Sequence, residues 1–152
     1  MSSSPSRRRA FPPLLLALAG GILAPGARAT GSGASGGGPT SERPLRIVLH
    51  VSDADGWGAA LSNLKNLTAL RPSPQLRVVV DGSGVYMLQG STDLTPQFAK
   101  YAGLGVEFMA CHNALAEKHI SPAALPGFVR VVPAAVVALA ESQYAGFAYV
   151  KP

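Results

Sequence analysis

Between residues 45 and 152, five short apolar segments alternate with stretches of helical periodicity, and few folds accommodate this alternation. The segments span residues 45–51, 76–80, 106–110, 128–132 and 147–150. The second segment is almost continuously apolar, which is typical of a strand that is buried on both faces. Strands that alternate with helices favour a parallel sheet, because each crossover helix packs back onto the sheet. We therefore predict an α/β fold with a mostly parallel sheet of about five strands and helices on both faces.

The helices are predicted from apolar periodicity and from residues that favour helix starts. Apolar side chains recur at steps of three and four over residues 57–70, and Asp55 is placed to cap that helix. Thr95 and Pro96 predict another start, with threonine as the cap and proline at the first helical position. Two more helices are expected, one on each side of the fourth strand.

The first 29 residues have the three parts of an export signal. Arginines at positions 7–9 precede an apolar run of 11 residues at 14–24, and Ala27-Arg28-Ala29 matches a small-x-small cleavage site. The run is shorter than the roughly 20 residues that a membrane-spanning helix needs. Arg8-Arg9 favours the twin-arginine route, and the general secretory route is the alternative. We expect cleavage after Ala29, a periplasmic location and no stable membrane anchor on the mature protein.

Composition after this leader separates a linker from one domain. Residues 30–44 are rich in glycine and serine and predict a flexible linker, so residues 45–152 are expected to form a single domain. Of the 13 basic residues four lie in the leader, which leaves nine against eight acidic residues. A nearly neutral domain with scattered charges gives no electrostatic reason to expect a nucleic-acid partner.

Cys111, the single cysteine of the chain, is the main candidate for chemistry. It ends a predicted buried strand and precedes a predicted helix, so its sulfur is expected near free backbone N–H groups and the positive end of a helix dipole. Both favour the thiolate, which is the nucleophilic form of cysteine. His112, the next residue, would tune the thiol in the same direction when protonated. The alternative is a structural Cys111 that acts as a small buried hydrophobe.

The loop after the second predicted strand is another candidate. Asp81, Gly82, Ser83 and Gly84 lie between a strand and a helix, as a phosphate-binding loop does. The loop lacks the third glycine of the dinucleotide-binding motif and the lysine of a P-loop, so a tight turn with close packing is the better interpretation. We expect it to shape a pocket beside Cys111, since the carboxyl ends of parallel strands meet at one edge.

The remaining residues give no firm metal or cofactor site. His112 and His119 are seven residues apart on a short predicted helix, and no third ligand has a fixed spacing. A single cysteine excludes an internal disulfide and any CxxC motif. We therefore expect no metal and no other cofactor.

Three stretches resemble the DsrE/DsrF-like proteins. They are Val106–Asn113 (VEFMACHN), Val132–Val136 (VPAAV) and Gln143–Pro152 (QYAGFAYVKP). The resemblance extends over residues 45–152 and rests most on the strand-ending cysteine and on the Gln-x-x-Gly-x-x-Tyr ending. It implies a five-stranded α/β fold with flavodoxin-like layering and assembly into homo- or hetero-oligomers.

The resemblance also implies a chemistry for Cys111. In the best understood members a cysteine carries sulfur as a persulfide and passes it between partner proteins, and that position matches Cys111. The leading hypothesis is an exported, homo-oligomeric sulfur carrier or sulfurtransferase that exchanges sulfur with a thiol-bearing donor or acceptor protein. Its pocket would be formed by Asp81, Gly82, Ser83, Gly84 and Asn113. A single thiolate can accept a sulfur atom and release it to another thiol without a second cysteine.

A hypothesis from a different class stays open beside it. The same fold would serve as a non-catalytic periplasmic binding or assembly module, with the same loop edge for a small ligand or a partner chain. Cys111 would then be structural. An enzyme with a bound redox cofactor is a third class, which only the twin-arginine leader favours.

Overall fold

The computed structural model describes residues 44–152. The predicted signal peptide and the predicted linker up to residue 43 lie outside these residues. The described part contains a five-stranded sheet in the order β4-β3-β2-β1-β5, in which every pair of neighbouring strands is parallel. The strands are β1 (Arg46–Val51), β2 (Gln75–Val80), β3 (Glu107–Cys111), β4 (Val129–Val132) and β5 (Ala148–Val150).

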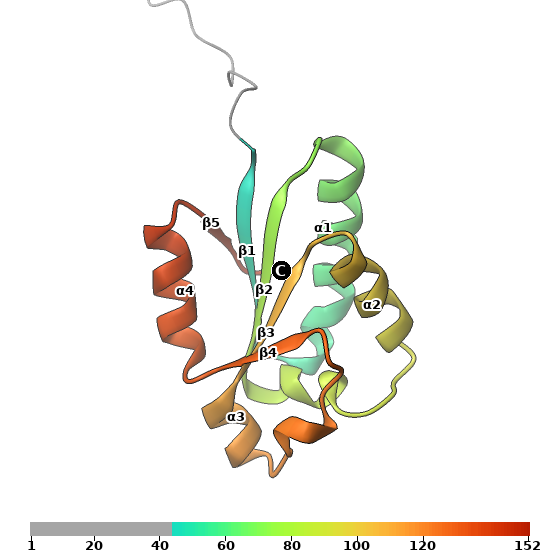
Figure 1. The fold of residues 1–152 in the computed structure, drawn as a ribbon, viewed down its shortest axis with the longest axis vertical. Helices are drawn as coiled ribbons and strands as arrows, with labels where there is room; N and C mark the ends of the chain where they lie inside the picture. The colour runs from blue at the N-terminus through green and yellow to red at the C-terminus, as the bar shows by residue number, and fades with distance from the viewer. Residues whose placement is uncertain (1–43) are drawn as a thin grey trace, which may run out of the picture. The chain divides into compact units, whose positions relative to one another are not determined.

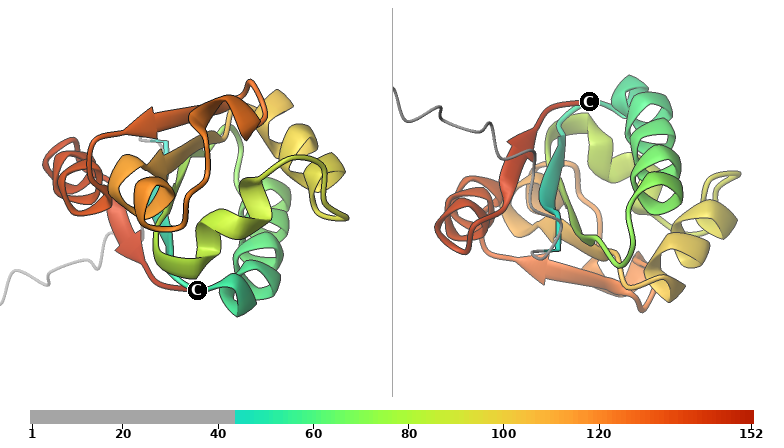
Figure 2. Two further views of the ribbon diagram at one scale, coloured as in Figure 1. Left: turned by 90° about the horizontal axis from the view of Figure 1, so that it is seen from below. Right: turned by 90° about the horizontal axis from the view of Figure 1, so that it is seen from above.

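Helices cover both faces of this sheet, so the predicted fold class is confirmed. They are α1 (Trp57–Leu70), α2 (Thr95–Gly103), α3 (His112–Glu117) and α4 (Ala135–Tyr144), with 3₁₀ turns η1 (Ala54–Gly56), η2 (Gly82–Leu88) and η3 (Pro122–Ala124). Figure 1 shows α1 and α2 on one side of the sheet and α4 on the other, and the view from above in Figure 2 shows the same layers end-on. Within residues 44–152, no helix has the length and apolarity to cross a membrane.

The strand order reverses at β1. The chain builds β2, β3 and β4 in turn toward one edge of the sheet, and α4 then carries it across the other face to β5, which pairs with β1. In open parallel sheets ligands bind beyond the carboxyl ends of the strands, at the place where the order reverses. The ends of β1 and β5 therefore mark the place to look for a site.

An aromatic cluster packs α1 and α2 onto the sheet. The ring of Phe98 lies 4.4 Å from that of Trp57 and 5.7 Å from that of Phe108, measured between centroids, and all three side chains are buried. Successive side chains of a strand point to opposite faces. Phe108 and Ala110 therefore face α1 and α2, whereas Met109 and Cys111 face α4.

The two predicted helix caps are each wrong by one residue. Asp55 lies inside the 3₁₀ turn η1, and the cap position of α1 is Gly56. Thr95 is the first residue of α2 rather than its cap, and its hydroxyl accepts a hydrogen bond from the backbone N–H of Thr92 at 2.8 Å. In both places a short turn precedes the helix and moves its start, which apolar periodicity does not reveal.

Candidate functional site

Cys111 lies where β3 ends and α3 begins. Its side chain is 6% exposed, and its sulfur accepts a hydrogen bond from the backbone N–H of Ala135 at 3.3 Å. Ala135 is the first residue of α4, so the donor belongs to α4 and not to α3, whose cap position makes no side-chain bond. The expected contact with a helix start is therefore made, but to a different helix. The register explains this, because Cys111 pairs with Val132 of β4 and the chain enters α4 three residues later.

The loop after β2 is a tightly packed turn. Gly82 has φ +49°, and a Cβ atom built on it would lie 2.3 Å from the carbonyl oxygen of Ser52. The N–H of Gly84 lies 3.3 Å from that oxygen and 3.0 Å from the carbonyl oxygen of Asp81, and its carbonyl accepts the indole N–H of Trp57 at 2.9 Å. The hydroxyl of Ser83 accepts from the N–H of Ala54. Hydrogen bonds within the protein therefore use these donors and acceptors of the loop, which agrees with the interpretation as a tight turn.

The two residues after Cys111 lie at the surface. His112 and Asn113 are the first two residues of α3, and both are exposed.

At the other end of α3, Glu117 and Lys118 form a surface ion pair at 2.8 Å. Its hydrogen bond, and then its charge interaction, lower the pKa of Glu117 and raise the pKa of Lys118. An exposed pair of this kind contributes little to stability.

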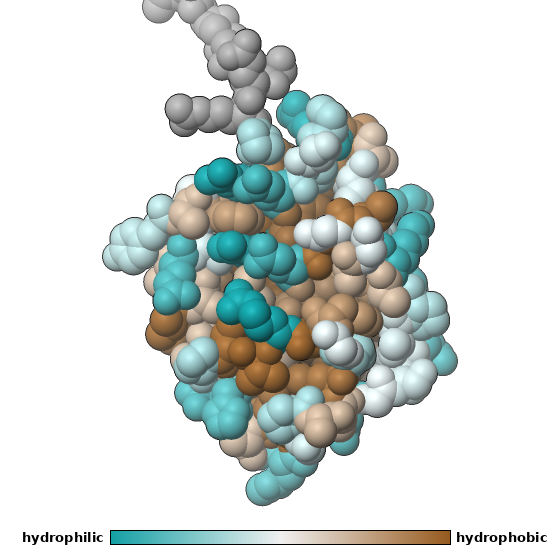
Figure 3. Space-filling view, in the orientation of Figure 1, coloured by the Kyte–Doolittle hydropathy of each residue, from teal (hydrophilic) through white to brown (hydrophobic). Residues whose placement is uncertain are grey.

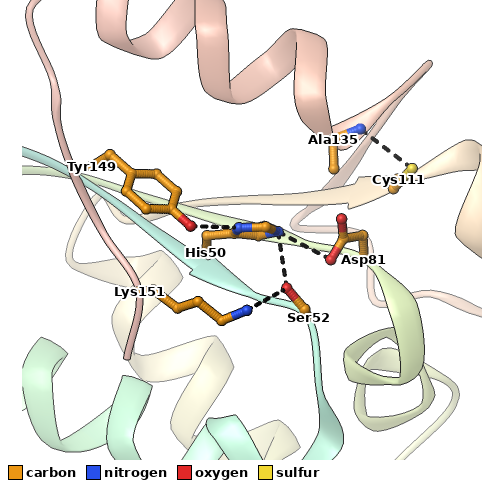
Figure 4. A network of polar contacts seen from close by, with 7 residues as sticks. All are labelled: His50, Ser52, Asp81, Cys111, Ala135, Tyr149 and Lys151. Atoms are coloured by element: carbon orange, nitrogen blue, oxygen red, sulfur yellow. Dashed lines mark hydrogen bonds and ion pairs between the residues drawn. The ribbon is translucent and has the colours of Figure 1, made fainter.

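A polar network that the sequence analysis did not foresee lies at the carboxyl ends of β1, β2 and β5 (Figure 4). The ring of His50 is at its centre: Nδ1 lies 2.9 Å from the hydroxyl of Tyr149 and Nε2 lies 3.1 Å from Oδ1 of Asp81. The hydroxyl of Ser52 is 3.2 Å from the same Nε2 and accepts from Nζ of Lys151 at 3.4 Å. The network therefore joins three strands at the point where the strand order reverses.

Asp81 is the one member of this network that is predicted from the sequence as a site residue. His50 lies within the first predicted strand, and Tyr149 is the tyrosine of the Gln-x-x-Gly-x-x-Tyr ending, but neither is predicted to lie in the site. A signal was present, since His50 and Tyr149 interrupt apolar strands close to their carboxyl ends. What the sequence could not supply was the pairing of β5 with β1, which brings residues 99 apart into contact.

A second polar cluster lies near the amino ends of β2, β3 and β5, at the end of the sheet opposite to the His50 network, and it has a structural role. The guanidinium of Arg77 lies 4.1 Å from the ring centre of Phe147 and donates to Glu107 and to the hydroxyl of Ser142, both at 3.2 Å. These contacts fix the end of α4 to β2. A cavity of about 570 Å³ opens beside them. Among residues 44–152, no three His, Cys, Asp or Glu side chains are grouped to hold a metal.

Comparison with known proteins agrees with the architecture. No family model and no curated protein matches the chain. A solved structure, of a protein of unknown function from Methanobacterium thermoautotrophicum, is 30% identical and superposes with a TM-score of 0.66. The match covers 71% of this chain and 99% of that one. The two proteins belong to one family. The comparison therefore supports the fold, and it gives no function because the function of that protein is unknown.

Proposed function

We propose that the protein is an exported DsrE/DsrF-like sulfur carrier, in which Cys111 accepts and releases one sulfur atom as a persulfide. The observation that carries the proposal is the hydrogen bond from the N–H of Ala135 to the sulfur of Cys111. A backbone N–H at a helix start stabilises negative charge. The thiolate is the form that attacks sulfur, and a persulfide anion on the same residue gains from the same donor.

The reaction needs no group beyond the thiolate and the donor. The Cys111 thiolate attacks the outer sulfur of a persulfide, R–S–SH. A bond forms between Sγ and that sulfur, the S–S bond of the donor breaks, and the donor leaves as the thiolate R–S⁻ with the electron pair. The product is Cys111–S–SH. The reverse step, with another thiolate as acceptor, returns the free cysteine.

Other features support the wider proposal. Residues 45–152 resemble the DsrE/DsrF-like proteins at the strand-ending cysteine and at the Gln-x-x-Gly-x-x-Tyr ending. The leader at 1–29 supports action in the periplasm after cleavage. We propose that the mature protein forms a homo-oligomer and exchanges sulfur with a thiol-bearing partner.

Alkylation of Cys111 tests this chemistry. An ordinary cysteine with a pKa near 8.5 is only a few per cent thiolate at about pH 7. We expect the native protein to react with iodoacetamide faster at that pH than the denatured protein, which lacks the bond from Ala135. The rate is followed by mass spectrometry, and Cys111→Ser provides the blank. A native thiol that reacts more slowly than the denatured one would contradict the proposal.

A second function, an assembly module with a structural Cys111, has its own support. The cysteine side chain is buried, and α4 exposes Val136, Val137 and Tyr144 at 72%, 49% and 92%. Figure 3 shows apolar surface on the face of the molecule that carries α4 and β4. The occupant we consider is a second copy of the chain. Under this alternative Cys111→Ala keeps the oligomer seen by analytical ultracentrifugation, whereas Tyr144→Asp disrupts it and sulfur uptake is absent from both.

A further inference from the structure

Four polar or reactive side chains form a row along the carboxyl edge of the sheet, one for each of four neighbouring strands. In spatial order they are Cys111 at the end of β3, Asp81 after β2, His50 in β1 and Tyr149 in β5. Val79 pairs with His50, and Asp81 lies two residues beyond Val79, so Asp81 and His50 share a face of the sheet. Their contact at 3.1 Å agrees with this placement. Cys111, which bonds to α4, belongs to the same row.

Asp81 and Cys111 are neighbours in this row. Val80 and Ala110 are paired, so the residues that follow them stand at the ends of adjacent strands, which lie about 4.8 Å apart. In Figure 4 one oxygen of Asp81 turns to His50 and the other points to the side where Cys111 and Ala135 lie. A carboxylate at the end of the adjacent strand disfavours negative charge on the sulfur. By itself, Asp81 therefore opposes both the thiolate and the persulfide anion.

His50 offsets this charge. An ionised carboxylate only accepts hydrogen bonds, so the tautomer of His50 that carries its hydrogen on Nε2 is the one that donates to Asp81. Tyr149 at Nδ1 holds the ring from its other side. The side chain of His50 is 15% exposed and that of Asp81 29%. Because water is largely excluded from the histidine, the pair is screened less than a surface pair.

Within residues 44–152, Asp81 forms an ion pair and a side-chain hydrogen bond with His50 and with no other charged group. Lys151 donates to the hydroxyl of Ser52, which lies 3.2 Å from Nε2 of His50. His112, at the start of α3, is exposed beside Cys111. The contact that governs the carboxylate is therefore the one made by His50.

We propose that His50 is a positioning residue for the sulfur chemistry of Cys111: it holds the Asp81 carboxylate and offsets its charge, so that negative sulfur forms on the adjacent strand. The proposal rests on the proposed function of Cys111. It assigns Tyr149 the task of fixing the histidine ring. It also explains how the acidic residue is accommodated beside a reactive thiol.

A double-mutant cycle on the purified protein tests the inference, with the rate of Cys111 alkylation by uncharged iodoacetamide as the readout. Asp81→Asn is expected to raise the rate severalfold near neutral pH, because it removes a negative charge from the end of the strand next to Cys111. His50→Leu removes the donor to Asp81 and is expected to slow the reaction by about threefold to tenfold. His50→Gln keeps a neutral donor and is expected to slow it less. The double variant His50→Leu/Asp81→Asn is expected to react like Asp81→Asn alone.

Glu141→Gln is the matched control, because it removes one exposed carboxylate from α4 and changes the net charge equally. Its rate is expected to stay at the wild-type value. If His50→Leu slows the reaction as much in the Asp81→Asn background as in the wild type, His50 does not act through Asp81 and the inference is overturned. An unchanged rate in Asp81→Asn overturns it as well. Circular dichroism checks the fold of each variant, and Tyr149→Phe replaces His50→Leu should the latter not fold, with a smaller slowing that also vanishes when combined with Asp81→Asn.

Sulfur uptake, measured as mass gain on the same variants, separates this inference from the proposed function. If the wild type takes up no sulfur but the double-mutant cycle gives the expected alkylation rates, the sulfur carrier is refuted and the coupling of His50 with Asp81 is retained. Uptake that proceeds equally in all variants refutes the role of His50 and leaves the sulfur carrier intact.

Discussion

Gly82→Ala is expected to lower the free energy of unfolding by about 3 kcal/mol, because two penalties act together. The backbone at Gly82 has φ +49°, a region that residues with a side chain rarely adopt. In addition, the new Cβ would lie 2.3 Å from the carbonyl oxygen of Ser52, which is backbone at the end of β1 and cannot move alone. Relief of this overlap requires the loop to separate from β1. Urea unfolding followed by circular dichroism measures the change.

Gly58→Ala is the matched control for this variant. A Cβ atom on Gly58 meets nothing within 4 Å, and the residue lies in the first turn of α1. Alanine favours a helix over glycine by roughly 0.5–1 kcal/mol, so this variant is expected to be as stable as the wild type or slightly more stable. Equal stability of Gly82→Ala and the wild type would show that the turn after β2 does not have the described conformation.

Phe98→Ala is expected to cost about 3–5 kcal/mol of stability, which for a domain of this size approaches the whole margin. Its ring is fully buried and lies against Trp57 and Phe108, with centroids 4.4 and 5.7 Å away. Alanine removes the contact of the Phe98 ring with Trp57 and Phe108 and leaves a cavity that the two remaining rings fill only in part. The midpoint of thermal unfolding and the urea midpoint are both expected to fall.

Tyr144→Ala is the control for loss of an aromatic side chain. Tyr144 lies at the end of α4 and is 92% exposed, so its removal is expected to change the stability of the isolated chain by no more than about 0.5 kcal/mol. A similar loss in both variants would mean that the aromatic cluster does not hold α2 to the sheet as described.

The fold was predictable from the sequence because its signal is local. Each strand is a short apolar run, and the helices are indicated by apolar residues that recur every three or four positions. Five strands and the intervening helices can therefore be predicted from residues that are close in sequence. A parallel sheet with helices on both faces then follows from the alternation. The starts of α1 and α2 were misplaced, because the turns before them depend on hydrogen bonds that periodicity does not report.

The candidate site was predictable only in part, because its contacts join distant residues. Cys111 could be placed at a strand end, but the donor to its sulfur lies 24 residues further on, in a helix that the crossover brings back over the sheet. His50 and Tyr149 are 99 residues apart, and their contact exists only because β5 pairs with β1. These contacts depend on the strand order, and no local sequence pattern predicts that order.

We expect Cys111 to take up one sulfur atom, and the intact mass of the native protein measures this uptake. The mass is recorded before and after incubation with a persulfide donor, with Cys111→Ser alongside, and it also locates the end of the leader. The expected result is a gain of one sulfur atom that is reversed by a reductant and absent from Cys111→Ser. A native protein with an intact thiol and no gain in mass would contradict the proposed function.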